Sequence, residues 1–475
     1  MRAKSHVKKG DLAEAEKLYE TILQKFSNNI RAQQGLASLI KYKQDSVIQN
    51  PPQESLNQLV NLYNQGQIEA VIQQAEVLTA QYPGAYVVWN ILGASKAQKG
   101  MLDEALEAYK KSISLKPDFA EVYSNMGVTL KNQGKLEEAI EAYKKSIALK
   151  PNDADTFYIM GVALKDQGKL EEAIKAYKNS ISLRPNYAEV YNNLGVVFQA
   201  QGKFDEAIQV FDKAILFKSD YAEAYNNKGA LLQELGKFDE AMEALNKSIT
   251  LRPNYSDAYN NIGLTLQSKG RLDEAIDAFT KAISLKFDYA EAHVNLGIAI
   301  KNVKFNSSNP KLYPPLTQLL TAGYFGRPRD VAESILSLLK QDIQIKDLLL
   351  KKNSAVSLNE ATSIIESLDK LPLLHHLMRV CPLPELQFEE LFVAMRSLLL
   401  KNLDKMEVSP ELIHFLSTLS IHCFTNEYVY IESDEETHLI DELQANISQI
   451  VAQSEQPETV KILCLASYRP LHQYD

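Results

Sequence analysis

Residues 188–221 carry two apolar patterns of helical spacing, one after the other. The apolar positions are Tyr191, Leu194 and Phe198 in the first half, and Ala207, Phe211 and Ala214 in the second. Positions three and four apart lie on one face of a helix, so each half predicts an amphipathic helix. Gly202 lies between the halves, where glycine supplies the left-handed residue that ends a helix. The segment therefore predicts a helical hairpin with its apolar stripes turned inward.

The same pattern returns along the chain with a period of 34 residues. A glycine inside the first predicted helix recurs without a slip, at Gly93, Gly127, Gly161, Gly195, Gly229, Gly263 and Gly297. Glycine in mid-helix costs roughly 1 kcal/mol relative to alanine, so its recurrence indicates close approach by the second helix of the same hairpin. A fixed period of this length predicts a stack of helical hairpins instead of one globular core.

Large and small residues follow a fixed order within each period. The repeat that begins at residue 86 shows the order in full, with Trp89, Leu92, Gly93, Ala105, Tyr109, Ser112 and Pro117. This order resembles the tetratricopeptide repeat (TPR) family, which implies an all-α, right-handed superhelical TPR solenoid. Six repeats match well, from 86–119 to 256–289, and a weaker one covers 52–85. The resemblance implies a protein-binding scaffold and is much less specific for function than for fold.

Interruptions of the period divide the chain into five expected parts. They are a divergent N-terminal hairpin at 1–44, a linker at 45–52, the TPR array with a C-terminal capping helix at 53–303, a second linker at 304–315, and an irregular all-α domain at 316–475. Ser219 and Phe287 replace the proline that follows the second helix in most repeats. We expect the hairpin joints at these two positions to be looser.

The C-terminal part carries a second resemblance. The strings CPLPELQFEEL (381–391), HCFTNEYVY (422–430) and LASYRPL (465–471) resemble the helical segment that follows the repeats in a group of bacterial TPR proteins. In that group an S-adenosylmethionine-dependent methyltransferase domain normally comes next, where this sequence stops at Asp475. No strand followed by a glycine-rich turn is present to bind that cofactor. The resemblance therefore implies association with a methyltransferase, and we expect the chain itself to be catalytically inert and without a cofactor.

Composition narrows the class of partner. The formal net charge of −9 and the pI of about 5.6 disfavour nucleic acid. The sequence contains no apolar run of about 18 residues, so no membrane span is predicted. The first residues lack the apolar stretch of a signal peptide. The three cysteines (Cys381, Cys423 and Cys464) show no close pairing, which indicates reduced thiols and a cytoplasmic protein. Protein partners are the class that remains.

Several groups of polar residues were weighed as chemical sites. His375 and His376 suggest a metal pair, but neighbours on a helix point about 100° apart and no third ligand stands nearby at helical spacing, so no metal is expected. His414, His422 and Cys423 fit core packing better than catalysis. The acidic cluster around Asp434 lacks calcium-loop spacing and fits helix capping. In the second domain the best polar candidates are Tyr324, Phe325, Arg327 and Arg329, with a turn before a helix as the alternative.

Asparagines recur in the first helices and supply the strongest functional pattern. Two residues before the recurring glycine stand Asn125, Asn193, Asn227, Asn261 and Asn295, which we call the ladder; directly before it comes the preceding row, Asn90, Asn192, Asn226 and Asn260. Ile91 and Ile159 interrupt the ladder. Because an amide both donates and accepts hydrogen bonds, such a row is suited to the main chain of an extended peptide. The ladder resembles that of the repeat domain of O-linked N-acetylglucosamine transferases; capping of neighbouring helices is the alternative.

The residues beside the ladder bear on the partner. One position after the glycine runs an apolar row, Ala94, Val128, Val162, Val196, Ala230, Leu264 and Ile298, and the helix starts present acids, Glu121, Asp155, Glu189, Glu223, Asp257 and Glu291. Acids at these positions disfavour a clamp for C-terminal carboxylates. The sequence predicts a non-catalytic scaffold for an extended polypeptide. Two alternatives stay open: the recruiting part of a transferase (methyltransferase before glycosyltransferase), and an oligomerisation module with an apolar patch near 45–52 or 290–303.

Overall fold

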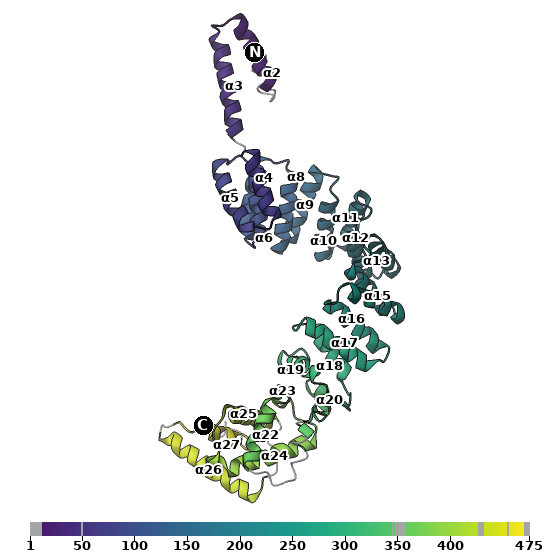
Figure 1. Ribbon diagram of the computed structural model, residues 1–475, viewed down its shortest axis with the longest axis vertical. Coiled ribbons are helices and arrows are strands. Elements are labelled where there is room, and N and C mark those ends of the chain that lie inside the picture. Colours follow the sequence, from purple (N-terminus) through teal and green to yellow (C-terminus); the bar gives the residue numbers. More distant parts are fainter. Residues whose placement is uncertain are drawn as a thin grey trace. The chain divides into compact units, whose positions relative to one another are not determined.

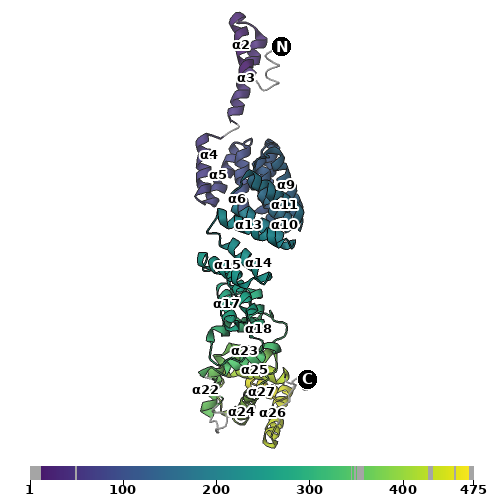
Figure 2. The same ribbon diagram turned by 90° about the vertical axis from the view of Figure 1, so that its right-hand side faces the viewer.

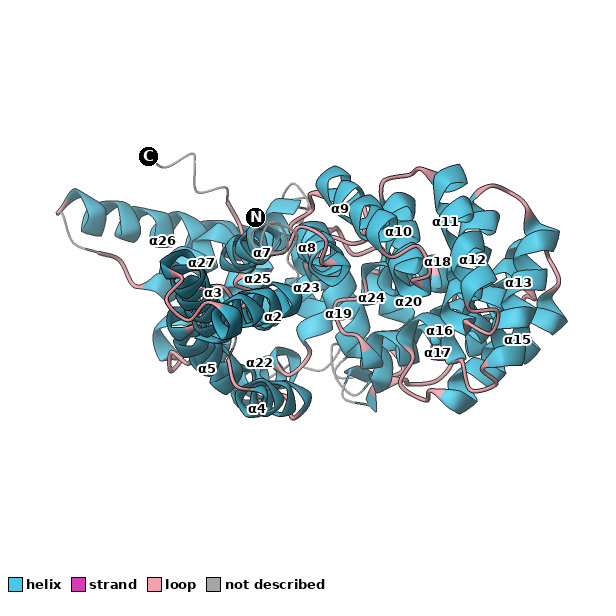
Figure 3. Cartoon of the chain, turned by 90° about the horizontal axis from the view of Figure 1, so that it is seen from above, coloured by secondary structure: helices cyan, strands magenta, loops and turns pink. Residues whose placement is uncertain are grey.

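The computed structural model describes residues 12–48, 51–343, 345–346, 349, 358–425, 432–453 and 456–469. Within these ranges the chain is all-α, and Figure 3 shows helices joined by short loops, with no strand in the described part. The chain falls into two compact units, Met1–Ser219 and Asp220–Asp475. The boundary coincides with Ser219, the first of the two joints that lack proline.

The first unit consists of helical hairpins in chain order (Figure 1). Its helices are α2 (Leu12–Lys25), α3 (Ile30–Ile48), α4 (Gln53–Asn64), α5 (Ile68–Gln81), α6 (Tyr86–Gln98), α7 (Leu102–Leu115), α8 (Ala120–Asn132), α9 (Leu136–Leu149), α10 (Ala154–Asp166), α11 (Leu170–Leu183), α12 (Ala188–Ala200) and α13 (Phe204–Phe217). Helix α3 continues through Ile48, so the linker expected at 45–52 begins later than the sequence suggested. Residues 1–11, including the Gly10 of the expected first hairpin, lie outside the described residues.

The second unit joins the last hairpins to the irregular helices (Figure 2). Its helices are α14 (Ala222–Glu234), α15 (Phe238–Leu251), α16 (Ser256–Ser268), α17 (Leu272–Leu285), α18 (Ala290–Ile300), the 3₁₀ turn η1 (Pro310–Leu312), α19 (Tyr313–Thr321), α20 (Arg329–Leu339), α22 (Leu358–Asp369), α23 (Pro372–Val380), α24 (Leu386–Lys401), η2 (Leu403–Lys405), α25 (Pro410–Thr425), α26 (Asp434–Ala452) and α27 (Thr459–Ala466). Residues 426–430 and 470–471, which belong to two of the resembling strings, lie outside the described residues.

Glycines shape each hairpin at two places. After the first helix, Gly202 has φ +71°, and the Lys203 N–H reaches back to the Phe198 carbonyl at 2.9 Å, which is the hydrogen bond of a Schellman cap. Inside the first helix, a Cβ added to Gly195 would lie 2.5 Å from Cε1 of Phe211. The predicted reason for the mid-helix glycine is confirmed: the aromatic ring of the second helix occupies the space of its side chain.

A serine near the end of the second helix ties the two helices of four hairpins together. Ser112 Oγ donates to the Tyr86 carbonyl at 2.8 Å, and Ser180 Oγ donates to the Ala154 carbonyl at the same distance. The carbonyl belongs to the first residue of the first helix, and the bond is shielded from water. Alanine takes the serine position in the repeats that contain α13 and α17.

An apolar core of the second unit runs through the segment where a linker was expected. Leu296 and Ile300 of α18 share a core cluster with Leu312 and Leu316, and this cluster continues to Val460 in α27. The 304–315 segment includes η1 and the start of α19, so only part of it is irregular. The irregular helices therefore cap the last TPR helix directly instead of forming a separate domain behind a spacer.

Candidate peptide-binding surface

The first helices form the inner face of each unit. In the first unit α6 packs against α8, α8 against α10 and α10 against α12, and in the second unit α14 packs against α16 and α16 against α18. The second helices of neighbouring hairpins approach one another less. A stack bends toward the side on which its neighbours are closest, so side chains on the first helices share a concave surface within each unit.

The two asparagine rows differ in exposure. The preceding row is buried, with exposed fractions of 8% for Asn90, 0% for Asn192, 5% for Asn226 and 1% for Asn260. The ladder is half-buried, so its side chains reach the surface. Buried amides need hydrogen-bond partners, and the next hairpin supplies them.

Each described pair links one hairpin to the next across 35 residues. The Nδ2 group of Asn125 donates to Asn90 Oδ1 at 3.1 Å, that of Asn261 to Asn226 Oδ1 at 3.0 Å, and that of Asn295 to Asn260 Oδ1 at 2.9 Å. The Nδ2 group of these three ladder residues therefore donates within the protein. The bond joins two neighbouring repeats and does not cap a helix, which was the alternative drawn from the sequence.

The exceptions to the rows follow the same pairing. Tyr158 stands in the preceding row, and its hydroxyl accepts a hydrogen bond from Asn193 Nδ2 at 3.0 Å. Ser124 stands one repeat earlier, and the ladder position that follows it by 35 residues is Ile159, which needs no acceptor. The choice of residue in one row therefore matches the choice in the other.

The paired amides keep a free acceptor toward the surface. In the described part of the chain no residue donates to the Oδ1 atoms of Asn125, Asn261 or Asn295. An amide oxygen accepts up to two hydrogen bonds. Because Nδ2 is held by the neighbouring hairpin, the orientation of this oxygen is set before any ligand arrives. The arrangement can accept hydrogen bonds from main-chain N–H groups.

Two of the acids at the helix starts form ion pairs within their own repeats. Arg184 donates to both carboxylate oxygens of Asp155 at 2.9 and 2.8 Å, and Lys218 lies 2.8 Å from Glu189. The hydrogen bond from Arg184 lowers the pKa of the Asp155 carboxyl below its usual value. The Tyr187 hydroxyl also donates to Asp155, and burial raises the pKa of that tyrosine well above its usual range. The surface beside the ladder thus carries less net charge than the row of acids suggested.

Parts of the apolar row are open to solvent. Val128 is 39% exposed and Ile298 is 49% exposed, one on each unit. Among consecutive ladder residues, Asn193 belongs to the first unit, while Asn227 and Asn261 belong to the second. Each unit therefore presents its own section of ladder and apolar row.

The polar candidates between α19 and α20 form a turn that packs on α18. A Cβ on Gly297 would lie 2.8 Å from Phe325, whose ring takes the place that a second-helix aromatic has in the repeats. The Tyr324 ring lies 5.2 Å from that of His293 on α18. Arg327 and Arg329 are exposed at the start of α20. Two of the four candidates therefore cover the end of the array, a role that the sequence did not suggest.

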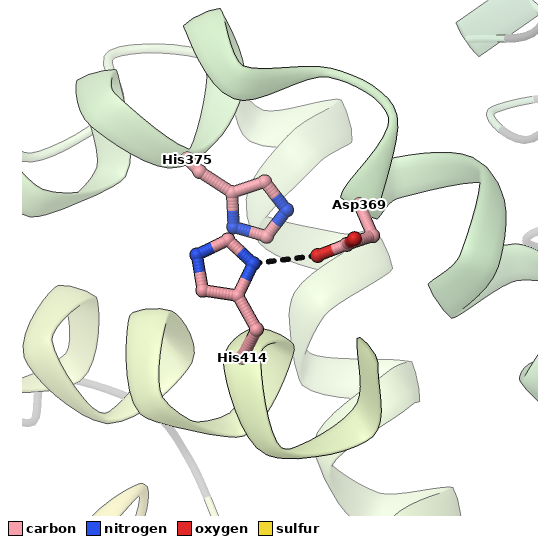
Figure 4. Close-up of side chains that lie close together, drawn as sticks. All are labelled: Asp369, His375 and His414. Atoms are coloured by element: carbon pink, nitrogen blue, oxygen red, sulfur yellow. Dashed lines mark hydrogen bonds and ion pairs between the residues drawn. The ribbon is translucent and has the colours of Figure 1, made fainter. Parts of the chain in front are cut away.

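His375 meets two ligand-type residues that the sequence had not joined to it, His414 and Asp369 (Figure 4). His414 Nδ1 lies 2.5 Å from Asp369 Oδ1, and the two imidazoles stack with centroids 4.5 Å apart at 20°. A metal binds in the plane of an imidazole, so parallel rings do not direct their nitrogens to one point. Both nitrogens of His375 also have partners, Thr418 Oγ1 at 3.1 Å and the Leu368 carbonyl at 3.2 Å. These contacts fit a packed, hydrogen-bonded cluster.

The other residues considered as chemical sites also have structural roles. His422 is buried, with its ring nitrogens 3.2 Å from the Met378 carbonyl and from Glu389 Oε1. Burial raises the pKa of the Cys423 thiol to about 12, which opposes a nucleophilic thiolate. In the acidic cluster, Ser433 and Glu436 form a capping box at the start of α26.

Comparisons with known proteins match the hairpin region. A TPR repeat model matches residues 93–134, 130–168, 161–202 and 198–236, and a tetratricopeptide repeat model matches 220–286. No curated protein matches the chain. None of the helices in the described ranges combines the length and apolar character needed to cross a membrane.

Solved structures similar to this chain include other repeat proteins. The crystal structure of MamA is 32% identical, covers 34% of this chain and 95% of its own, and has a TM-score of 0.33. YrrB, described as a TPR protein with an unusual peptide-binding site, is 24% identical, with coverage of 39% and 96% and a TM-score of 0.33. The APC/C hetero-tetramer Cut9-Hcn1 is 19% identical, with coverage of 61% and 52% and a TM-score of 0.44.

Repeated helical hairpins with an inner face of regularly spaced side chains define a repeat protein of the interaction-scaffold class. The chain belongs to the tetratricopeptide repeat family.

Proposed function

We propose that this chain is a non-catalytic scaffold that binds an extended polypeptide along the first-helix face, with ladder asparagines contacting the main chain of the ligand. The observation that carries the proposal is the pairing of the two rows. Since the preceding row holds the Nδ2 groups of Asn261 and Asn295, their Oδ1 atoms are fixed acceptors at equivalent positions of two neighbouring hairpins, and Asn125 is held in the same way in the first unit. A fixed acceptor loses less conformational freedom on binding than a mobile one.

The surroundings of the ladder favour the same ligand. Two of the acids at the helix starts, Asp155 and Glu189, are paired with basic residues of their own repeats, and exposed apolar side chains such as Ile298 lie one turn from the ladder. Uncharged amides with apolar side chains beside them suit a peptide that is recognised through its main chain and an occasional apolar side chain. Three free, buried cysteines accord with a reducing, cytoplasmic setting, which remains part of the proposal.

The test uses a substitution that the chain already contains. In the second unit, Asn226→Ser with Asn261→Ile, and Asn260→Ser with Asn295→Ile, copy the natural pair of Ser124 and Ile159 and so remove both ladder acceptors without orphaning a buried amide. Peptides of 16 residues are first selected on the parent chain from a displayed random library, and their affinities are then measured by fluorescence anisotropy.

We expect the fourfold variant to bind these peptides about 5- to 150-fold more weakly, because two hydrogen bonds are each worth roughly 0.5–1.5 kcal/mol. Asn246→Ala, on the second helix α15, is the control and should leave affinity unchanged. Circular dichroism should show the same helicity and melting for all three proteins. Undiminished affinity in a folded fourfold variant would remove the ladder from the binding surface.

The alternative, recruitment of substrate for a transferase, rests on the resemblance of the C-terminal strings alone. It predicts that a methyltransferase acts in association with this chain. The scaffold proposal does not depend on it, because the ladder would serve a recruiting module equally well.

A further inference from the structure

We propose that a groove on the second-helix side of the second unit binds a large apolar side chain of a partner protein, in an extended segment that carries a carboxylate next to it. The groove lies between α17 and the segment that contains η1 and the start of α19, and its volume is about 490 Å³. Sites for small ligands and side-chain anchors occupy roughly 300–1,000 Å³. No ladder residue lines it.

The groove exists because this repeat departs from the pattern. Pro253 follows the second helix one repeat earlier, whereas Phe287 takes that place here and remains 56% exposed. Pro314 and Pro315 form the opposite wall, and Ile283 of α17 also lines the groove. An exposed aromatic ring beside prolines provides an apolar surface that a partner side chain can cover.

A buried histidine is packed between the two walls. His293 is fully buried on α18, with Nε2 2.9 Å from the Phe287 carbonyl and Nδ1 3.1 Å from the Pro315 carbonyl. Its ring lies edge-on to that of Phe287, with centroids 6.4 Å apart. The width of the groove is therefore set without a ligand, which reduces the cost of binding one.

The charges at the groove are the reason to expect a carboxylate beside the apolar side chain of the ligand. Lys281 and Lys311 line it, and neither has an ion-pair partner among the residues that the structure describes. Asp277 is the one acid among the lining residues, so the groove carries a local excess of positive charge on a chain of net charge −9. A partner carboxylate complements this excess. One repeat earlier, the hollow beside α15 is lined by Lys228 and Lys247 together with two acids, Glu240 and Glu243, and has no such excess.

The test compares substitutions that the repeat pattern makes safe. Phe287→Pro restores the residue that most repeats have; Lys286 has φ −139° and ψ 92°, close to the −141° and 88° of Lys116, which precedes Pro117. The backbone is therefore ready for proline. Lys281→Glu with Lys311→Glu reverses the charge, and Lys247→Glu is the matched control one repeat earlier.

The probe is the fluorescein-labelled peptide Glu-Glu-Phe-Leu-Glu-Glu, blocked at its C-terminus, and its affinity for the full chain is measured by anisotropy. We expect the parent and Lys247→Glu to bind it alike, and both groove variants to bind it at least about tenfold more weakly. The peptides Lys-Lys-Phe-Leu-Lys-Lys and Glu-Glu-Ala-Ala-Glu-Glu should bind the parent weakly. Equal affinity of all three peptides, or unchanged binding by both groove variants, would overturn the proposal. Self-association of the chain in sedimentation, with loss of probe binding as the chain associates, would also overturn it, because a second copy would then occupy the groove.

Discussion

At the residue scale, the recurring glycine lowers the helix propensity of the first helix but allows the second helix to pack closely against it. Gly195→Leu adds a side chain where Phe211 already lies 2.5 Å from the position of a Cβ. We expect the variant to lose roughly 1–3 kcal/mol of stability through overpacking, although leucine is the better helix former by about 0.8 kcal/mol. Urea unfolding of the full chain measures the change. Gly326→Leu, where a Cβ would meet no atom within 4 Å, is the control; equal effects of the two substitutions would contradict the packing account.

His375 gives a prediction for pH at the same scale. Burial lowers its pKa to about 4, whereas an unfolded histidine titrates near 6.5. Between these values the unfolded chain binds a proton that the folded chain does not, so stability falls as the pH is lowered from about 6.5 toward 4. The loss between pH 7 and pH 5 should shrink by about 1–2 kcal/mol in His375→Gln. Urea midpoints of both proteins at the two pH values test this, and an unchanged pH dependence would show that His375 does not carry the effect.

At the element scale, the end of the array is closed by a ring from outside the repeats. Phe325 fills the space beside Gly297 that a second-helix aromatic fills elsewhere. We expect Phe325→Ala to destabilise the second unit by about 1–3 kcal/mol, less than a fully buried phenylalanine because the ring is half-buried. Gly297→Ala should destabilise the parent but stabilise Phe325→Ala, since its methyl group then enters a void. A destabilising effect in both backgrounds would contradict this assignment.

Helices and hairpins were the part of the fold most open to prediction, because apolar spacing and glycine caps are local signals. The turn glycine of α12 and the close approach of the second helix to Gly195 were both predicted; the aromatic ring that makes the contact was not. The pairing of Asn261 with Asn226 was not, because it joins side chains 35 residues apart in different repeats. The matched choice of Ser124 and Ile159 was the available signal. The role of Phe325 was hidden because the irregular helices have no period to align with the repeats.

At the scale of the whole molecule, each hairpin of the first unit contacts mainly its neighbours, while the second unit has a core that extends from Leu245 to Val460. Hydrogen exchange should therefore be graded in the first unit, fastest in α2 and α3 and slowest toward α10 and α11. Helices α16 to α18 should instead open together with α19 and α23. Uniform exchange across the first unit, or exchange of α18 ahead of α19, would contradict this.

Catalytic inertness is a second prediction at this scale. None of the described polar clusters combines a nucleophile with a base, and the sequence has no glycine-rich phosphate loop after a strand. Calorimetric titration of the full chain with S-adenosylmethionine should show no binding. A dissociation constant in the micromolar range would require a cofactor site and would favour an enzyme over a scaffold.

The central claim is that ladder asparagines accept hydrogen bonds from the main chain of the ligand. An ester in place of a peptide bond removes one N–H donor and leaves the side chains unchanged, so the most direct measurement is a double-mutant cycle. The cycle compares four affinities: those of the ester-substituted and the normal form of a selected peptide, each for the parent and for the fourfold asparagine variant. We predict that one of the ester positions weakens binding to the parent by about 2- to 12-fold and has no effect on the variant. An equal loss with both proteins at every position would contradict main-chain recognition by the ladder.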